Sequence, residues 1–191
     1  MARPVVHTDS LRQELLAVTA DLVDRDGPAR VTLRDVAAAA RTSTTAVYSL
    51  FGGKSQLLTA VVDDGFRSFH DSQVAASPGG LQGLGAAYRT WALEHQALYR
   101  LMFGGALAAY VDCQPSPDVA ADAMVPLINA VATAQTAGTL LPAPAEMVAV
   151  AIWGQVHGLV SLELAQVGPP DADWAAVYSS ALDAIARGWA A

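Results

Sequence analysis

The sequence predicts an all-α protein, with an N-terminal three-helix head over residues 1–56 and a larger helical body over residues 57–191, about nine helices in total. Apolar residues recur three and four positions apart in the long segments, and no segment shows the two-residue alternation of a strand. Hydrophobic residues make up 53% of the 191 residues and charged residues only 15%, so the chain can bury a substantial core.

The first predicted helix begins at Asp9 or Ser10. Its apolar residues fall in helical register, and Gly27-Pro28 ends it, because glycine suits a left-handed cap and proline blocks continuation. We expect this helix to support the two short helices that follow.

Residues 31–58 predict a helix-turn-helix. Thr32 and Asp35 have the spacing of a capping box, and they precede a short amphipathic helix that ends at Ala40. After a turn at Arg41-Thr42, Ser43 can cap a second helix that directs Val47 and Phe51 inward. Its outward residues are small and polar, which is the shape that a major groove admits: Thr44, Thr45, Tyr48 and Ser49.

The remaining segments also predict helices. Ser77-Pro78-Gly79-Gly80 is the clearest break, and residues 106–111 are ambiguous. The expected helices run from Lys54 to about His70, Leu81 to His95, Ala97 to Phe103, Asp118 to Ala137 with a kink at Pro126, Ala145 to Val167, and Asp171 to Trp189.

Charge is distributed unevenly along the chain. The formal net charge is −7, yet residues 1–56 carry +1 and the remainder carries −8. This asymmetry directs the head toward phosphate, although the head's charge is small, so tight binding to nucleic acid would need two heads.

The helix-turn-helix segment resembles the DNA-binding domain of tetracycline-repressor (TetR) family regulators. The matching residues run without a gap from Thr32-x-Arg34-Asp35-x-Ala37 through Ser43, Ala46-Val47-Tyr48 and Phe51 to Lys54-x-x-Leu57-Leu58. The resemblance implies that Tyr48 and Lys54 contact operator phosphates and that Thr44, Thr45, Ala46 and Arg34 face bases. The full set of candidate DNA-binding residues is Thr32, Arg34, Ser43, Thr44, Thr45, Ala46, Tyr48, Ser49 and Lys54.

Three residues depart from the family pattern. Arg41 stands at the turn position that is usually glycine, and it bears a strain cost if that position needs a positive φ. Gly53 replaces the usual serine cap, and Leu50 replaces a residue that often lies near the DNA backbone. These departures leave operator affinity and sequence open.

The last two predicted helices are unusually apolar. Small residues in 145–167 allow close helix approach, and the following helix has a broad apolar face, so a symmetric four-helix dimer interface is their natural use. Trp153-Gly154-Gln155-Val156-His157-Gly158 also resembles the Trp-x3-His-Gly (WHG) signature of one TetR C-terminal subgroup, and Glu94 to Phe103 resembles a second segment of that subgroup, with Gln96 in place of its proline.

Candidate effector-binding residues are the aromatic and polar side chains of the body. A helical stripe of aromatics usually forms only core, so pocket lining and plain packing both stay open for Tyr88, Trp91, His95, Tyr99, Met102, Phe103, Trp153 and His157. The four histidines lack metal-ligand spacing, Cys113 has no neighbouring cation, and no catalytic pattern is present, so no cofactor, metal or catalytic residue is expected.

These patterns predict a homodimeric transcription regulator, a repressor that binds a palindromic operator in double-stranded DNA and is released by a small, mostly apolar effector. The N-terminus lacks a signal-peptide core, no uninterrupted apolar run is long enough to span a bilayer, and one cysteine suits a reducing compartment, so we expect a cytoplasmic protein with no membrane partner. One alternative is a helical sensor or interaction protein with weakened DNA binding, and a third interpretation is a small helical enzyme.

Overall fold

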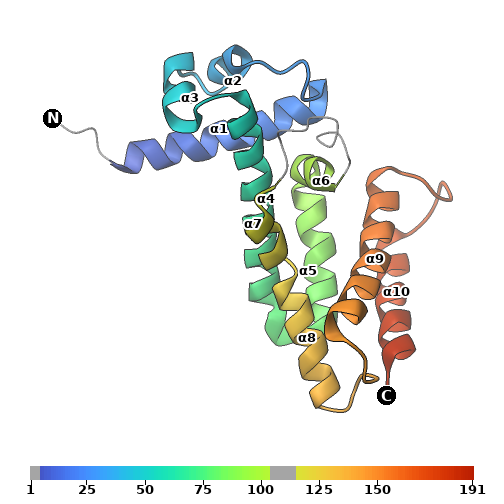
Figure 1. Cartoon of the computed structure of the whole chain (residues 1–191). Coiled ribbons are helices and arrows are strands. Elements are labelled where there is room, and N and C mark those ends of the chain that lie inside the picture. Colours follow the sequence, from blue (N-terminus) through green and yellow to red (C-terminus); the bar gives the residue numbers. More distant parts are fainter. Residues whose placement is uncertain (1–4, 104–114) are drawn as a thin grey trace. The chain divides into compact units, whose positions relative to one another are not determined.

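The computed structural model describes residues 5–103 and 115–191, and within these ranges it is helical without strands (Figure 1). The all-α prediction is confirmed. The helices, in chain order, are α1 Val5–Asp26, α2 Leu33–Ala39, α3 Thr44–Phe51, α4 Lys54–Ala76, the short 3₁₀ helix η1 Ser77–Gly79, α5 Gly80–Glu94, α6 Gln96–Phe103, α7 Pro117–Asp122, α8 Val125–Thr136, α9 Ala145–Leu164 and α10 Trp174–Trp189.

The helices form two compact units. The first unit comprises residues 1–67 and 97–120, and the second comprises residues 68–96 and 121–191. The long helix α4 supplies its first part to one unit and its last part to the other.

In the first unit, α2 packs against both α1 and α3. Leu15, Val36 and Val47 are fully buried, one from each of these three helices, and they form the centre of a small core. Gly27 ends α1 at φ 80°, a left-handed conformation that favours glycine, and its N–H donates to the Val23 carbonyl over 2.9 Å. The sequence therefore ends the helix where predicted.

In the second unit, α5 packs against α8, α9 and α10, and α9 packs against α8 and α10. Fully buried valines and a leucine hold these helices together. The Tyr178 hydroxyl donates to the Gly85 carbonyl over 2.8 Å, and a Cβ at Gly85 would lie only 2.5 Å from the Leu182 side chain. Gly85 thus permits α5 and α10 to approach closely.

Helix α9 has two apolar faces. Val148, Ile152, Val156 and Val160 recur every four residues and are buried inside the unit. On another face Met147 is 52% exposed, Val150 55% and Leu162 44%. By length and composition alone α9 could cross a membrane, but the core helix of a soluble protein meets the same criterion, so this single helix is weak support for a membrane span.

Several predicted boundaries need correction. Helix α1 begins at Val5 rather than Asp9 or Ser10, and α4 continues to Ala76 rather than ending near His70. The single kinked helix predicted over residues 118–137 is two helices, because Pro126 lies in the first turn of α8, where its missing N–H costs nothing. Helices α9 and α10 are shorter than predicted, and the ambiguous segment 106–111 and Cys113 lie outside the described residues.

Candidate nucleic-acid interface and apolar cavity

The capping box at the start of α2 is present. The Asp35 N–H donates to Thr32 Oγ1 over 3.2 Å, while Asp35 Oδ2 accepts from the Thr32 N–H at 2.9 Å and from the Thr32 hydroxyl at 2.6 Å. These hydrogen bonds, that of the Thr32 hydroxyl first, lower the pKa of Asp35. The box fixes the N-terminus of α2 and therefore the position of Arg34, which is exposed in its first turn.

The turn between α2 and α3 contains a residue with positive φ at the position where the family usually has glycine. Arg41 has φ 50°, so this residue adopts a left-handed conformation that costs an L-residue roughly 1 kcal/mol. Ser43 then caps α3, its hydroxyl accepting from the Ala46 N–H over 3.1 Å. The hydroxyls of both Thr32 and Ser43 are therefore used in caps.

Helix α3 has one buried and one exposed face. Val47 and Phe51 are buried, and the Arg12 guanidinium lies over the Phe51 ring at 4.8 Å from its centroid. The opposite face carries the predicted contact residues: Thr44, Thr45 and Ser49 are exposed, Ala46 is half-buried, and Tyr48 is 57% exposed. A polar helix face of this kind, presented by a capped helix-turn-helix, fits a major groove.

Lys54 opens α4 close to this face in sequence. Its ammonium donates to the Ala29 carbonyl over 3.3 Å, which ties the start of α4 to the loop after α1. An ammonium has three N–H donors, so a single bond to a carbonyl does not by itself prevent a contact with a phosphate oxygen. Gly52, at φ 84°, ends α3 two residues before Lys54.

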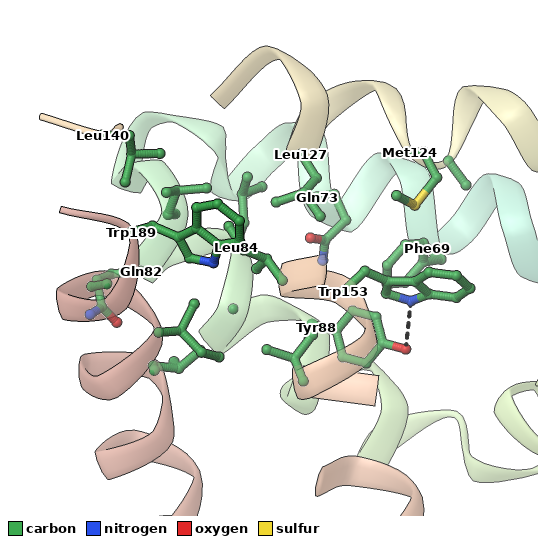
Figure 2. A pocket seen from close by; sticks show the side chains of 18 residues that line it. Phe69, Gln73, Gln82, Leu84, Tyr88, Met124, Leu127, Leu140, Trp153 and Trp189 are labelled. Carbon is green, nitrogen blue, oxygen red and sulfur yellow. Dashed lines mark hydrogen bonds between the residues drawn. The ribbon is translucent and has the colours of Figure 1, made fainter. Parts of the chain in front are cut away.

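The second unit contains a narrow apolar cavity of about 50 Å³. Side chains from α4, α5, α8, α9 and α10 form its wall (Figure 2). Its lining residues are Phe69, Gln73, Leu81, Gln82, Leu84, Gly85, Tyr88, Ala123, Met124, Leu127, Leu140, Ile152, Trp153, Val156, Leu182, Ile185, Ala186 and Trp189. None of these described residues is charged at neutral pH.

A chain of hydrogen bonds leads from the cavity wall into α9. The Trp153 indole N–H donates to the Tyr88 hydroxyl over 3.3 Å (Figure 2), and that hydroxyl lies 2.9 Å from His157 Nδ1. Because indole can only donate, the hydroxyl accepts from Trp153. In the tautomer whose Nδ1 accepts from this hydroxyl, a neutral His157 carries its proton on Nε2, which lies 3.4 Å from Ser161 Oγ. Burial lowers the pKa of His157, which favours this neutral form.

The predicted effector-binding residues are divided between the two units. Tyr88 and Trp153 line the cavity. Trp91 is buried and contacts the rings of Phe69 and His95, with centroid distances of 5.3 and 5.0 Å respectively. His157 bonds to the Tyr88 hydroxyl. The other three predicted residues belong to α6 in the first unit: Tyr99 and Phe103 pack edge to face at 5.1 Å, and Met102 fills the space beside Gly65.

Two arginines outside the helix-turn-helix, Arg89 and Arg100, form ion pairs. Arg89 forms a bidentate ion pair with Glu163 at 2.8 and 2.6 Å, within the second unit. Arg100 of α6 forms another with Asp24 of α1, both bonds at 2.6 Å, within the first unit. Neither guanidinium lines the apolar cavity.

Sequence reasoning missed most of the cavity wall, including Gln73, Leu140 and Trp189. For Gln73 a signal was present. Val62, Phe66 and Phe69 form an apolar stripe, and Gln73 continues it four residues further, a polar residue at a core position. Because the predicted helix ends near His70, Gln73 falls outside it and is not among the predicted site residues.

Two family models match this chain. One, described as bacterial regulatory proteins of the tetR family, matches residues 15–61. The other, described as the tetracyclin repressor-like C-terminal domain, matches residues 81–185, which is more than half of the chain. The chain belongs to the TetR family of transcriptional regulators. The narrower likeness to the WHG subgroup stays a prediction.

Solved structures share the TetR fold over nearly the whole chain. A protein of unknown function from Rhodococcus sp. RHA1 is 27% identical, with a TM-score of 0.77 and coverage of 95% of this chain and 96% of that one. A TetR family transcription regulator from Marinobacter aquaeolei VT8 is 21% identical, with a TM-score of 0.76 and the same coverages. A regulatory protein in the tetR family from Rhodococcus RHA1 is 21% identical, with a TM-score of 0.73 and coverages of 93% and 95%. No curated protein matches the chain.

Membership of the TetR family gives the helix-turn-helix and the helical body their general roles. The family consists of DNA-binding regulators, whose members typically bind a ligand and act as dimers. This TetR-family chain is therefore a transcription regulator with a DNA-binding head, as the sequence predicted.

Proposed function

We propose that this protein is a ligand-responsive repressor that binds a palindromic operator as a homodimer in the cytoplasm. The exposed polar face of α3, held in a capped helix-turn-helix, carries this proposal. Thr44, Thr45, Ala46 and Ser49 would meet base edges, with Arg34 beside them, while Tyr48 and Lys54 would hold phosphates. Thr32 and Ser43 support the same surface through their caps.

We propose the exposed face of α9, together with α10, as the dimer interface. Met147, Val150 and Leu162 are exposed in the single chain. Gly154 and Gly158 lie on the same face, and a Cβ at either would meet no atom within 4 Å, so the fold of one chain does not require glycine there. A second helix that approaches this face closely would require it.

Two heads in a dimer can read successive major grooves only when they lie roughly 34–36 Å apart, or a multiple of that distance. We propose that residues 1–56 serve as the DNA-binding domain and residues 57–191 as the ligand-binding and dimerisation domain. Helix α4 is continuous between them, so an effector that moves its second half would change the position of the first. Release from DNA then follows from the effector's differential affinity for the two states.

Selection of random duplex DNA on the purified protein tests this function. We expect a palindrome to be enriched at low salt, with affinity that falls steeply as salt rises, because phosphate contacts release counterions. Tyr48→Ala and Lys54→Ala should each weaken binding about tenfold or more in the dimer, since each variant loses a contact in both heads. Val125→Ala, an exposed side chain on α8, is the matched control and should bind as the wild type does.

A helical sensor or interaction protein with weakened DNA binding is the second candidate. The strained Arg41 and the partly used Lys54 ammonium favour it. If no sequence is enriched at low salt, the repressor proposal fails and this candidate replaces it.

A further inference from the structure

The cavity of the second unit has a buried carboxamide directed into its interior. Gln73, on the last part of α4, is only 5% exposed to solvent, and Figure 2 shows its carboxamide directed inward among the lining side chains. Its side-chain hydrogen bond to another described residue is long, 3.5 Å from Nε2 to the Ser72 hydroxyl. The amide oxygen accepts no hydrogen bond from a described residue.

The unpaired amide oxygen faces open space. Among the described residues, no fully enclosed side-chain nitrogen or oxygen lacks a hydrogen-bond partner. The Gln73 oxygen has no partner among the described residues, so it is not a fully enclosed atom, and the space that Gln73 lines is the cavity. A ligand that displaces water from this buried amide without replacing its hydrogen bond loses affinity, so the amide selects a molecule that can form hydrogen bonds.

Of the other polar groups in the wall, the Trp189 indole N–H has no hydrogen-bond partner among the described residues, whereas three others are engaged. The Tyr88 hydroxyl and the Trp153 indole bond to each other, and Gln82, which is exposed, donates to Asp183 over 3.2 Å. Since no lining residue is charged at neutral pH, nothing in the cavity would compensate a buried carboxylate or ammonium.

From this arrangement we infer that Gln73 is the polar anchor of the effector site, and that the effector is an uncharged molecule with an apolar body and one hydrogen-bonding group. The group lies against the Gln73 carboxamide, and the apolar body lies along Leu84, Leu127 and the Trp189 ring. This inference deepens the proposed function, because it rests on the same cavity being the effector site.

A ligand of this class must enlarge the cavity. A volume of about 50 Å³ holds a few water molecules, whereas sites for drug-sized ligands measure about 300–1,000 Å³. Leu140 and Trp189 form one end of the wall, where Leu141 N–H donates to the Trp189 carbonyl over 2.9 Å and Leu140 and Ala190 form an isolated bridge. Binding is therefore coupled to movement of the wall, which is what a ligand-driven switch requires.

Three probes with the same eight-carbon chain test the inference: 1-octanol, octanoate and octylammonium. Titration of the full-length protein at pH 7.5, followed by tryptophan fluorescence, reports on Trp153 and Trp189 in the cavity wall. We expect saturable binding of octanol, and binding at least about tenfold weaker for both charged probes, because their charge would be buried without a partner.

Substitutions of Gln73 test whether its carboxamide binds the hydrogen-bonding group of the effector. Gln73→Leu keeps the side-chain size and should weaken octanol binding about two- to tenfold, whereas Gln13→Leu, the same change at an exposed position of α1 that does not line the cavity, should leave it unchanged. Gln73→Glu should reverse the preference toward octylammonium, which a general loss of packing would not do. Far-UV circular dichroism of each variant identifies any that fails to fold, and either of the two Gln73 variants is sufficient.

Absence of octanol binding, equal or tighter binding of octanoate, or unchanged octanol affinity in Gln73→Leu would each overturn the inference. The titration needs no DNA, so the two proposals fail separately. If a palindrome is selected but octanol does not bind, only the ligand class is wrong. If octanol binds through Gln73 but no DNA sequence is selected, the proposed effector site is supported and the proposed repressor function is wrong.

Discussion

At the scale of single residues, the Thr32–Asp35 box gives the head a defined start. Two backbone N–H groups that would otherwise lack partners are satisfied within four residues. The box is local, so its contribution to stability can be separated from any contact with DNA.

We predict that Thr32→Ala lowers the free energy of unfolding by about 1 kcal/mol, because the substitution removes the side-chain half of the cap. Thr45→Ala is the matched control: Thr45 is exposed and its hydroxyl bonds to no described residue, so its effect should stay within about 0.5 kcal/mol. Denaturant unfolding at one protein concentration measures both variants. Equal effects would show that the cap does not stabilise the head.

His157 is the residue whose protonation should alter stability near neutral pH. Burial lowers its pKa below the ordinary value of 6.5 in the folded state, so the unfolded chain takes up the proton more readily. Its contribution to stability is full above about pH 6.5 and is lost as the pH falls below that value toward the folded-state pKa.

We therefore expect thermal unfolding to show a loss of stability between pH 7.5 and 5.5 that is smaller in His157→Gln. The lowered carboxyl pKa values of Asp24 and Asp35 act below their ordinary 3.8, outside this range. The same pH dependence in wild type and variant would mean that His157 does not titrate as inferred.

At the scale of secondary-structure elements, the bidentate Arg100–Asp24 pair joins α6 to α1 inside the first unit. Hydrogen bonding from Arg100, opposed in part by burial, lowers the pKa of Asp24. The side chains remain 44% and 24% exposed, so solvent screens their attraction and the pair's stabilisation is modest.

A double-mutant cycle with Asp24→Asn and Arg100→Gln should give a coupling energy of about 0.5–1 kcal/mol that decreases as salt increases. The adjacent, more exposed pair Arg25–Asp26 is the control and should show weaker coupling with Arg25→Gln and Asp26→Asn. Denaturant unfolding supplies the four free energies of each cycle. A coupling no larger than that of the control pair would mean that the Arg100–Asp24 contact does not stabilise the first unit.

At the scale of the whole molecule, α9 has an apolar face that stays exposed to solvent in a single chain. We predict that Gly158→Glu converts the dimer to monomer, with at least a tenfold rise in the dimer dissociation constant, because a charged side chain would occupy the line of closest helix approach. Sedimentation equilibrium measures the constant.

Ala132→Glu is the matched control for that prediction. It places the same charge on an exposed position of α8, outside the proposed interface, and should leave the dimer unchanged. If Gly158→Glu remains dimeric at the same concentrations, the proposed interface on α9 is wrong.

The sequence by itself determined the head. The caps at Thr32 and Ser43, the left-handed Gly27 and the alternation of buried and exposed positions on α3 all depend on residues within four positions of each other. Such short-range rules can be applied directly to a sequence, and they predict both the helix-turn-helix and the family resemblance. A positive φ at Arg41, by contrast, is a condition that the sequence leaves open and that the structure meets.

Only the tertiary structure decided what the body contains. The cavity is formed by helices that are far apart in sequence. A hydrogen bond joins Tyr88 to His157 across 69 positions, and Arg100 pairs with Asp24 across 76. Helical periodicity gives each residue a face but not the neighbour opposite it, so Tyr88 and Trp153 were selected together with aromatics that lie elsewhere. Gln73 is a candidate anchor because α4 continues to Ala76, and its last part, which includes Gln73, belongs to the second unit.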